Sequence, residues 1–144
     1  MIELVNQQRK IKINSEGFRE IAEKAIGSVP AARGKTATIA FVSDSKMRRL
    51  NQEFRGKNQT TDVLSFPFEP DAFSVAENAL NLGDVVISAE QAARQAAENN
   101  LSLETEISQL ILHGILHLCG YDHETDNGKM NILELKLRDK LGIS

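Results

Sequence analysis

The chain has 144 residues and a formal net charge of -3, and it contains a single cysteine, Cys119. This length predicts one domain that is large enough to be stable without a disulfide. The negative net charge means that the molecule as a whole is not a polycation, so contact with nucleic acid would require a local cluster of Lys and Arg. The sequence has no run of about 18 apolar residues and its N-terminus lacks the pattern of a signal peptide, so we expect a cytoplasmic protein without a membrane span.

The first half of the chain predicts short strands and two helices. Ser15 is placed to cap the first helix, and Met47, Leu50 and Phe54 follow the helical period in the second. Pro67 favours an edge position for the strand that contains it, because proline donates no hydrogen bond to a neighbouring strand. The strands are expected at residues 2–5, 10–13, 36–43 and 62–68.

The second half predicts a long loop, one strand and further helices. The loop covers residues 69–81 and the strand covers residues 84–88. Ser88 and Ser102 each precede a helix as caps, and Gly120 is the expected stop of the helix that follows Ser102. The last helix has one apolar face. That face consists of Met130, Leu133, Leu137 and Leu141.

Strands and helices are therefore mixed along the chain without strict alternation. This arrangement predicts an α/β (α+β) fold in which one mixed sheet is packed by helices. The sequence shows no internal repeat and no linker-like stretch. We therefore expect residues 1–144 to form a single domain.

All three histidines of the chain lie in the segment from residue 113 to residue 123. His113 and His117 are four residues apart on a predicted helix, so they share a face and lie about 6 Å apart along its axis. Gly120 accepts a positive φ, which ends the helix and returns His123 towards the first pair. A lone histidine on an apolar helix is more often a hydrogen-bonded core residue. Three histidines at this spacing around a turn glycine predict a metal site instead.

The residues around the histidines predict the type of metal site. Three neutral imidazoles favour zinc over nickel, copper or iron, and a catalytic zinc usually has three protein ligands plus water. Cys119 should point away from His117 on the helix, and Asp122 is better placed to orient an imidazole than to bind the metal. Gly114 occupies the position where H-E-x-x-H metalloproteases carry their glutamate, so a protease is disfavoured. This glycine allows either close helix packing or room for a substrate.

A local cluster of positive charge lies between residues 46 and 57, where the only acid is Glu53. Its cations are Lys46, Arg48, Arg49, Arg55 and Lys57. A solvated helix face explains most of them equally well, but Arg55 ends the helix just before a glycine loop and a strand, where side chains converge on sites. Guanidinium matches phosphate, and a metal with an arginine suffices for phosphodiester cleavage. Three neighbours either line the same cleft or cap the loop and strand: Thr61, Asp62 and Ser65.

Three blocks of the sequence, in this order, resemble the YbeY family of bacterial metal-dependent endoribonucleases. They are LNQEFRGKNQTTDVLSFPF at residues 50–68, LGDVVIS at residues 82–88 and HGILHLCGYDH at residues 113–123. The histidine block is the most specific of the three. The resemblance covers the chain from about Thr36 to His123, whereas the first 35 residues and the last helix match only loosely.

The resemblance implies a small domain with helices around a sheet of about four strands and a metal in a cleft at the end of a helix. It implies that His113, His117 and His123 bind one zinc ion and that Arg55 engages phosphate, which makes all four catalytic residues. It also implies single-stranded ribosomal RNA as the substrate, in 16S rRNA 3′-end maturation and ribosome quality control. The partners would be the small ribosomal subunit and its assembly factors.

Two other classes of function stay open from the residues alone. One is a zinc hydrolase acting on a peptide or a small molecule, which would not need the basic cluster. The other is a non-catalytic ribosome-assembly factor, in which zinc would only stabilise the turn at Gly120. An assembly factor of this kind would tolerate loss of Arg55. The nucleophile also stays open, because an activated water and the RNA 2′-hydroxyl are both compatible with the metal site.

Overall fold

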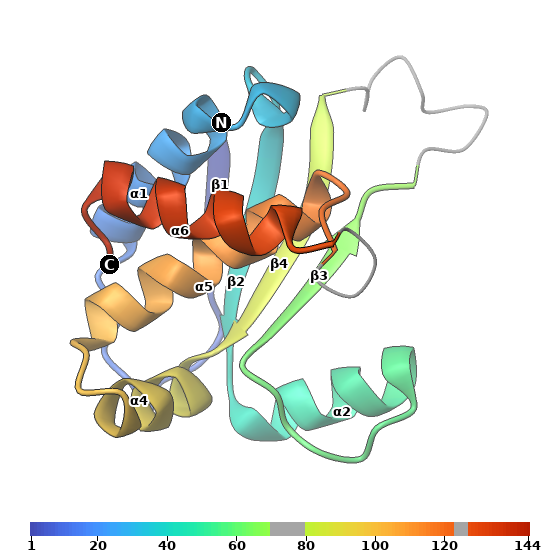
Figure 1. Ribbon diagram of the computed structural model, residues 1–144. Helices are drawn as coiled ribbons and strands as arrows, with labels where there is room; N and C mark the ends of the chain where they lie inside the picture. The colour runs from blue at the N-terminus through green and yellow to red at the C-terminus, as the bar shows by residue number, and fades with distance from the viewer. Residues whose placement is uncertain (70–79, 123–126) are drawn as a thin grey trace.

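The computed structural model of the chain describes residues 1–69, 80–122 and 127–144 (Figure 1). Its centre is a mixed sheet of four strands in the order β1-β2-β4-β3. β1, β2 and β4 are parallel, and β3 runs antiparallel to β4 at one edge. The strands are β1 (Ile2–Asn6), β2 (Thr36–Val42), β3 (Val63–Pro67) and β4 (Asn81–Ser88). The predicted fold class and the predicted edge position of Pro67 are therefore confirmed.

Helices pack on both faces of this sheet (Figure 1). They are α1 (Ser15–Ser28), the short 3-10 helix η1 (Pro30–Ala32), α2 (Asp44–Arg55), α4 (Ala89–Glu98), α5 (Leu103–Leu118) and α6 (Lys129–Leu141). Ser88 and Ser102 cap α4 and α5 as predicted, each accepting a hydrogen bond from the backbone N–H three residues later. None of the described helices is long and apolar enough to cross a membrane.

Three local predictions need correction. Residues 10–13 are not a strand: the amide group of Gln8 exchanges hydrogen bonds with the backbone of Ile11, which takes up groups that a strand would pair. The cap of α1 is Asn14 rather than Ser15, because the Asn14 side chain accepts from the Gly17 N–H and Ser15 is already helical. β4 begins at Asn81, three residues before the predicted start, and residues 70–79 of the predicted loop lie outside the described part.

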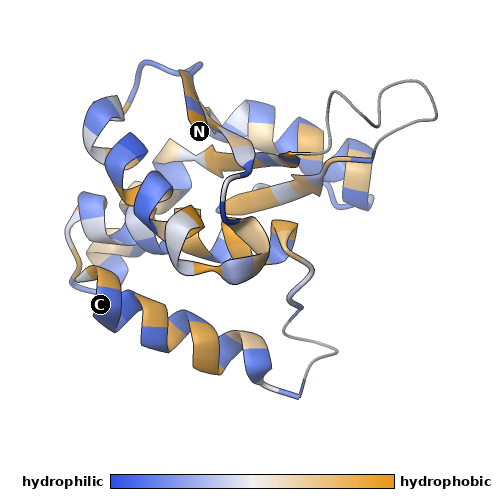
Figure 2. Ribbon diagram, turned by 90° about the horizontal axis from the view of Figure 1, so that it is seen from above, coloured by the Kyte–Doolittle hydropathy of each residue, from blue (hydrophilic) through white to orange (hydrophobic). Residues whose placement is uncertain are grey.

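The two faces of the sheet carry different amounts of apolar packing. The main core lies between the sheet and the helices α1, α5 and α6, and includes Ile39 and Phe41 of β2. A smaller cluster lies on the opposite face, where Met47 of α2 packs against Leu64 and Val86. Apolar and polar residues alternate along α6, as Figure 2 shows, which follows from its helical period. β4 is buried on both faces instead, because Val85 and Ile87 belong to the main core and Val86 to the smaller cluster.

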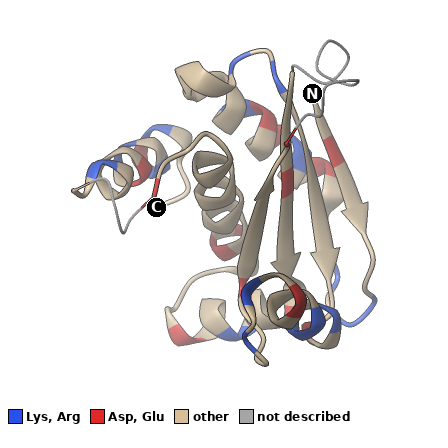
Figure 3. Cartoon of the chain, turned by 90° about the vertical axis from the view of Figure 1, so that its right-hand side faces the viewer, with Lys and Arg blue, Asp and Glu red and all other residues tan. Residues whose placement is uncertain are grey.

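α5 is the central helix of the molecule. It contacts β3 and β4 on one side and α6 on another, so it lies between the sheet and α6 (Figure 3). Gly114 faces β4 so closely that an added Cβ would lie 2.5 Å from Val85 Cγ1. The packing interpretation of Gly114 is therefore confirmed, and this glycine does not serve to leave room for a substrate. This close approach sets the distance between α5 and β4, and so the distance of the side chains of α5 from the sheet.

Candidate metal and phosphate site

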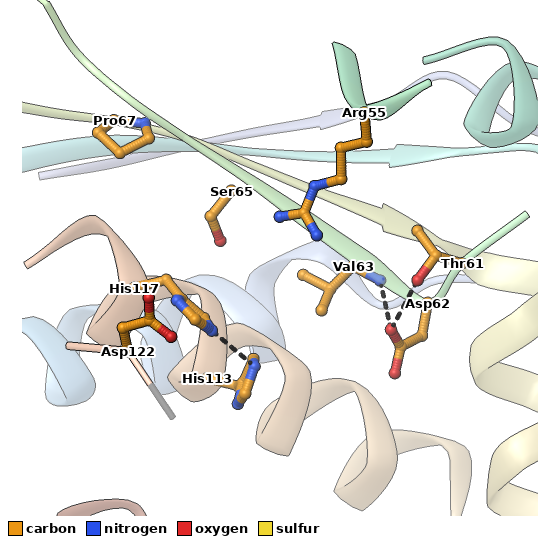
Figure 4. Close-up of a pocket in the computed structure, with 9 residues that line it drawn as sticks. All are labelled: Arg55, Thr61, Asp62, Val63, Ser65, Pro67, His113, His117 and Asp122. Atoms are coloured by element: carbon orange, nitrogen blue, oxygen red, sulfur yellow. Dashed lines mark hydrogen bonds between the residues drawn. The ribbon is translucent and has the colours of Figure 1, made fainter. Parts of the chain in front are cut away.

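A pocket of about 480 Å³ lies between α5 and the edge strand β3 (Figure 4). It brings together most of the residues that the sequence analysis selected from two distant parts of the chain. The pocket is lined by Arg55, Thr61, Asp62, Val63, Ser65, Pro67, His113, His117 and Asp122. One wall therefore carries histidines and the other wall carries a guanidinium and hydroxyl groups.

The histidine pair occupies the face of α5 that points into the pocket (Figure 4). The Nε2 atoms of His113 and His117 lie 3.1 Å apart, and the two rings meet edge to face with centroids 4.6 Å apart. Two nitrogen ligands at about 2.0–2.1 Å from a tetrahedral zinc ion are separated by about 3.3 Å. The pair therefore fits a single metal ion without a change in the backbone of α5.

The predicted third ligand, His123, lies outside the described residues. The chain leading to it behaves as predicted: α5 ends at Leu118 and Gly120 adopts a φ of 94°. Asp122 lines the pocket together with the histidine pair. Within residues 1–69, 80–122 and 127–144, no three His, Cys, Asp or Glu side chains are grouped so that they would hold a metal. A third protein ligand would therefore come from outside the described residues, and the ligand role of His123 stays a prediction.

Cys119 is not among the residues that line the pocket, although it follows His117 by two positions. Its side chain packs against the main core. Burial raises the pKa of the Cys119 thiol, with Lys35 lowering it by a smaller amount. Cys119 therefore has the properties of a small core residue, as predicted.

Glu134 of α6 is the residue that the sequence analysis missed. Its Oε1 atom lies 2.6 Å from Nδ1 of His113, and its Oε2 atom accepts from the Arg138 guanidinium at 3.0 Å. A local pattern does not reveal a contact between residues 21 positions apart. One signal was nevertheless present, because Glu134 lies on the apolar face of α6 between Met130 and Leu137. An acidic residue within an apolar helix face is a candidate for a buried, partnered group.

Arg55 is the cation that the fold brings to this pocket. It is the last residue of α2, and Gly56 ends the helix with a φ of 68°. Figure 4 shows its guanidinium pointing from the end of α2 into the pocket, towards the wall that carries the histidines. Two other cations of the cluster are engaged elsewhere: Lys46 donates to Gln7 and Arg48 donates to Asn58. The structure thus separates Arg55, which lines the pocket, from Lys46 and Arg48.

The three polar neighbours of Arg55 combine both interpretations that the sequence left open. Asp62 accepts from the Val63 N–H at 2.8 Å and from the Thr61 hydroxyl at 3.4 Å, so it caps the start of β3. Ser65 donates to the backbone carbonyl of Gly114 at 3.3 Å and so joins β3 to α5. Thr61, Asp62 and Ser65 also line the pocket. The Ser65 hydrogen bond joins the two walls, whereas the Asp62 hydrogen bonds stay within the wall that carries Arg55.

Comparison with known proteins identifies the fold and the family. Residues 3–142 match the sequence profile of the family described as Endoribonuclease YbeY. The chain belongs to the YbeY family. This match covers nearly the whole sequence, including α1 and α6, and not only the three blocks. The resemblance to the YbeY family that the blocks suggested is therefore confirmed.

Relatives named Endoribonuclease YbeY are similar over most of their length. The protein from Clostridioides difficile (strain 630) is 42% identical over 147 residues, covering 98% of this chain and 96% of the relative. The protein from Solibacter usitatus is 45% identical over 112 residues, covering 78% of this chain and 70% of the relative. The solution structure of TM1509 from Thermotoga maritima has a TM-score of 0.60 at 29% identity, over 98% of this chain and 89% of that one.

Proposed function

We propose that this chain is a metal-dependent endoribonuclease that cleaves single-stranded RNA in the pocket between α5 and β3. Its class, a hydrolytic endoribonuclease, follows from its membership of the YbeY family. The observation that carries the metal-dependent part is the approach of two Nε2 atoms to 3.1 Å, with Arg55 lining the same pocket. This combination favours a phosphodiester over a peptide, because the guanidinium is a phosphate ligand.

We assign the metal to His113, His117 and His123, with zinc as the ion that three imidazoles favour. When bound, the ion supplies Lewis acidity to the reacting phosphodiester. Arg55 binds the phosphate oxygens and neutralises the charge that develops on them during cleavage. Asp122 lines the pocket beside the histidines and orients an imidazole. Ser65 joins the Arg55 wall to α5 through its hydrogen bond to Gly114, and Asp62 fixes the start of β3 through its bond from the Val63 N–H.

The cellular role belongs to the same proposal. We assign the chain to 16S rRNA 3′-end maturation and to ribosome quality control in the cytoplasm, in contact with the small ribosomal subunit and its assembly factors. The support is the three blocks shared with the YbeY family, at residues 50–68, 82–88 and 113–123. Residues 1–144 form the single domain that carries this activity.

The test is cleavage of a labelled single-stranded RNA by the purified protein, compared with the same RNA in a duplex. Cleavage is expected only for the single strand, and it should stop on addition of a chelator and return with added zinc. Elemental analysis of the protein as isolated identifies the ion. Cleavage that survives both chelation and His117→Ala, in protein repurified until a mock preparation is inactive, does not depend on the metal and overturns the proposal. A protein that binds ribosomal RNA and zinc but never cleaves is a non-catalytic assembly factor instead.

A further inference from the structure

We infer that Glu134 is a positioning residue of the metal centre: its carboxylate holds His113 in the tautomer and ring orientation that direct Nε2 towards the metal. The inference rests on the proposed metal site and extends it to α6, a helix outside the three blocks of residues that suggested the family. It is carried by the juxtaposition of a buried carboxylate with the ring nitrogen of His113 opposite the one that faces His117.

The hydrogen bond fixes which nitrogen of His113 carries the proton. Glu134 Oε1 lies 2.6 Å from His113 Nδ1. An ionised carboxylate has no proton to donate, so Nδ1–H is the donor. In a neutral imidazole the other nitrogen, Nε2, then carries a lone pair. That nitrogen is the one 3.1 Å from His117 Nε2, so the lone pair is directed to where the metal is proposed.

The burial of Glu134 shows that its carboxylate is held in place. The residue is 4% exposed, and a buried carboxylate is costly unless it is paired. Arg138, one turn later on α6, donates to Oε2 at 3.0 Å, while His113 occupies Oε1. A purely structural ion pair would need Arg138 alone. The second contact, to a proposed metal ligand, is the one that a positioning role requires.

The packing of α6 delivers this carboxylate to α5. Met130 and Leu137, which flank Glu134 on the same face, are both buried in the main core. α6 lies against α5 on the side away from the sheet (Figure 3). The metal ligands are thus supported from both sides, by β4 through Gly114 and by α6 through Glu134.

Metal affinity in Glu134→Gln is the first test. Zinc affinity is measured by competition with a chromophoric chelator, so the readout does not depend on cleavage. Loss of such a partner typically weakens binding by about 10–100-fold, and Glu134→Gln should fall in this range. The matched control is Glu106→Gln on α5: Glu106 is equally buried, at 5% exposed, but its carboxylate accepts from Asn99 and not from a histidine. The control should bind zinc like the wild type.

The tautomer of His113 is the second test and separates positioning from mere stability. Long-range ¹H–¹⁵N spectra of the metal-free protein should show the Nδ1–H form of His113 in the wild type. Glu134→Leu, which removes the acceptor, should shift His113 towards the Nε2–H form. If Glu134→Leu fails to fold, Glu134→Gln, which keeps the volume of the side chain, is compared in its place, and a changed ratio of the two forms is the expected result.

The outcomes distinguish this inference from the proposed function. If the wild type binds zinc tightly and Glu134→Gln binds it equally well with an unchanged tautomer, only the positioning role is overturned. If Glu134→Gln and Glu106→Gln weaken binding by the same factor, Glu134 acts through stability and the inference is overturned. A wild-type protein that binds no divalent ion overturns the metal site and this inference with it.

Discussion

The two walls of the pocket are built in different ways. The wall formed by α5 is rigid, because Gly114 touches β4 on one side of the helix and Glu134 of α6 contacts His113 on another. The opposite wall ends in Arg55, an exposed residue at the last position of α2. Metal ligands must hold a geometry within fractions of an ångström, whereas a phosphate contact needs charge and reach. The packing around each wall is consistent with the role proposed for it, metal binding for the α5 wall and phosphate binding for the Arg55 wall.

This contrast makes separate predictions for the two walls. Changes in the α5 wall should affect metal binding first and cleavage as a consequence. Changes at Arg55 should affect cleavage and leave the metal in place. An Arg55 variant that loses its zinc, or an α5 variant that loses cleavage while it keeps its zinc affinity, would contradict this division.

The largest effect is expected for His117→Ala. Removal of one of the two nitrogens that lie 3.1 Å apart should weaken zinc binding by more than about a hundredfold, which exceeds the typical loss for a residue that only orients a ligand. Cleavage should be lost with the metal. Cys119→Ala is the matched control, because Cys119 follows two residues later but packs into the core. Zinc content and cleavage of both variants are the measurements, and loss of zinc from Cys119→Ala would make that residue a fourth ligand.

Arg55→Ala should lower the rate of RNA cleavage by about 10²–10³-fold, the typical effect of removing one group that stabilises developing charge. Its zinc content should match that of the wild type, because Arg55 belongs to the other wall. Arg49→Ala is the control: Arg49 is an exposed arginine of the same helix that does not line the pocket. Single-turnover rates on one RNA compare the three proteins. Undiminished cleavage by Arg55→Ala would remove this residue from the mechanism.

Local chemistry explains why much of the pocket was predictable from sequence. The spacing of His113 and His117 fixes a shared helix face, and Gly120 marks the end of that helix. Ser88 and Ser102 are caps whose hydrogen bonds reach only three residues along the chain. Each of these predictions depends on neighbours in sequence, which is the range over which residue patterns carry information.

The features that could not be predicted depend on contacts between distant segments. Glu134 meets His113 only because α6 folds back over α5, and the choice between two roles for Gly114 required the position of Val85. The alternating residues 10–13 resemble a strand, but the Gln8 side chain pairs with Ile11 instead. Tertiary packing and side-chain hydrogen bonds thus override local pattern at these sites.

Gly114→Ala tests the rigidity of the α5 wall. The added methyl group would lie 2.5 Å from Val85 Cγ1, so α5 or β4 must move. Overpacking of this kind costs about 1–3 kcal/mol of unfolding free energy, measured by chemical denaturation. A shift of α5 should also weaken zinc binding, since the histidines move with the helix. The double variant Gly114→Ala with Val85→Ala should recover the zinc affinity if the clash is the cause. Unchanged stability in Gly114→Ala would contradict the close approach.

Asp44→Asn tests how the Arg55 wall is anchored and should have the smallest effect. Asp44, the first residue of α2, accepts hydrogen bonds from Ser88, Thr60 and Arg94, which tie the base of that helix to β4, α4 and the loop before β3. Burial raises the pKa of Asp44, but the hydrogen bonds from Ser88, Arg94 and Thr60 outweigh it and leave the pKa below its usual value. At neutral pH the substitution should cost about 1–2 kcal/mol, since it removes the charge from these bonds.

The sign of the pH dependence follows from that lowered pKa. The folded protein holds the Asp44 proton more weakly than the unfolded chain does, so the carboxylate stabilises the fold at every pH above the unfolded pKa of about 3.8. This contribution is lost as the pH falls through the lower folded pKa. The difference in unfolding free energy between wild type and Asp44→Asn should therefore be constant from pH 5 to pH 7 and shrink below about pH 4. A difference that persists at pH 2 would mean that the carboxylate charge does not anchor α2. Zinc affinity should stay unchanged in this variant, because Asp44 supports only the wall that carries Arg55.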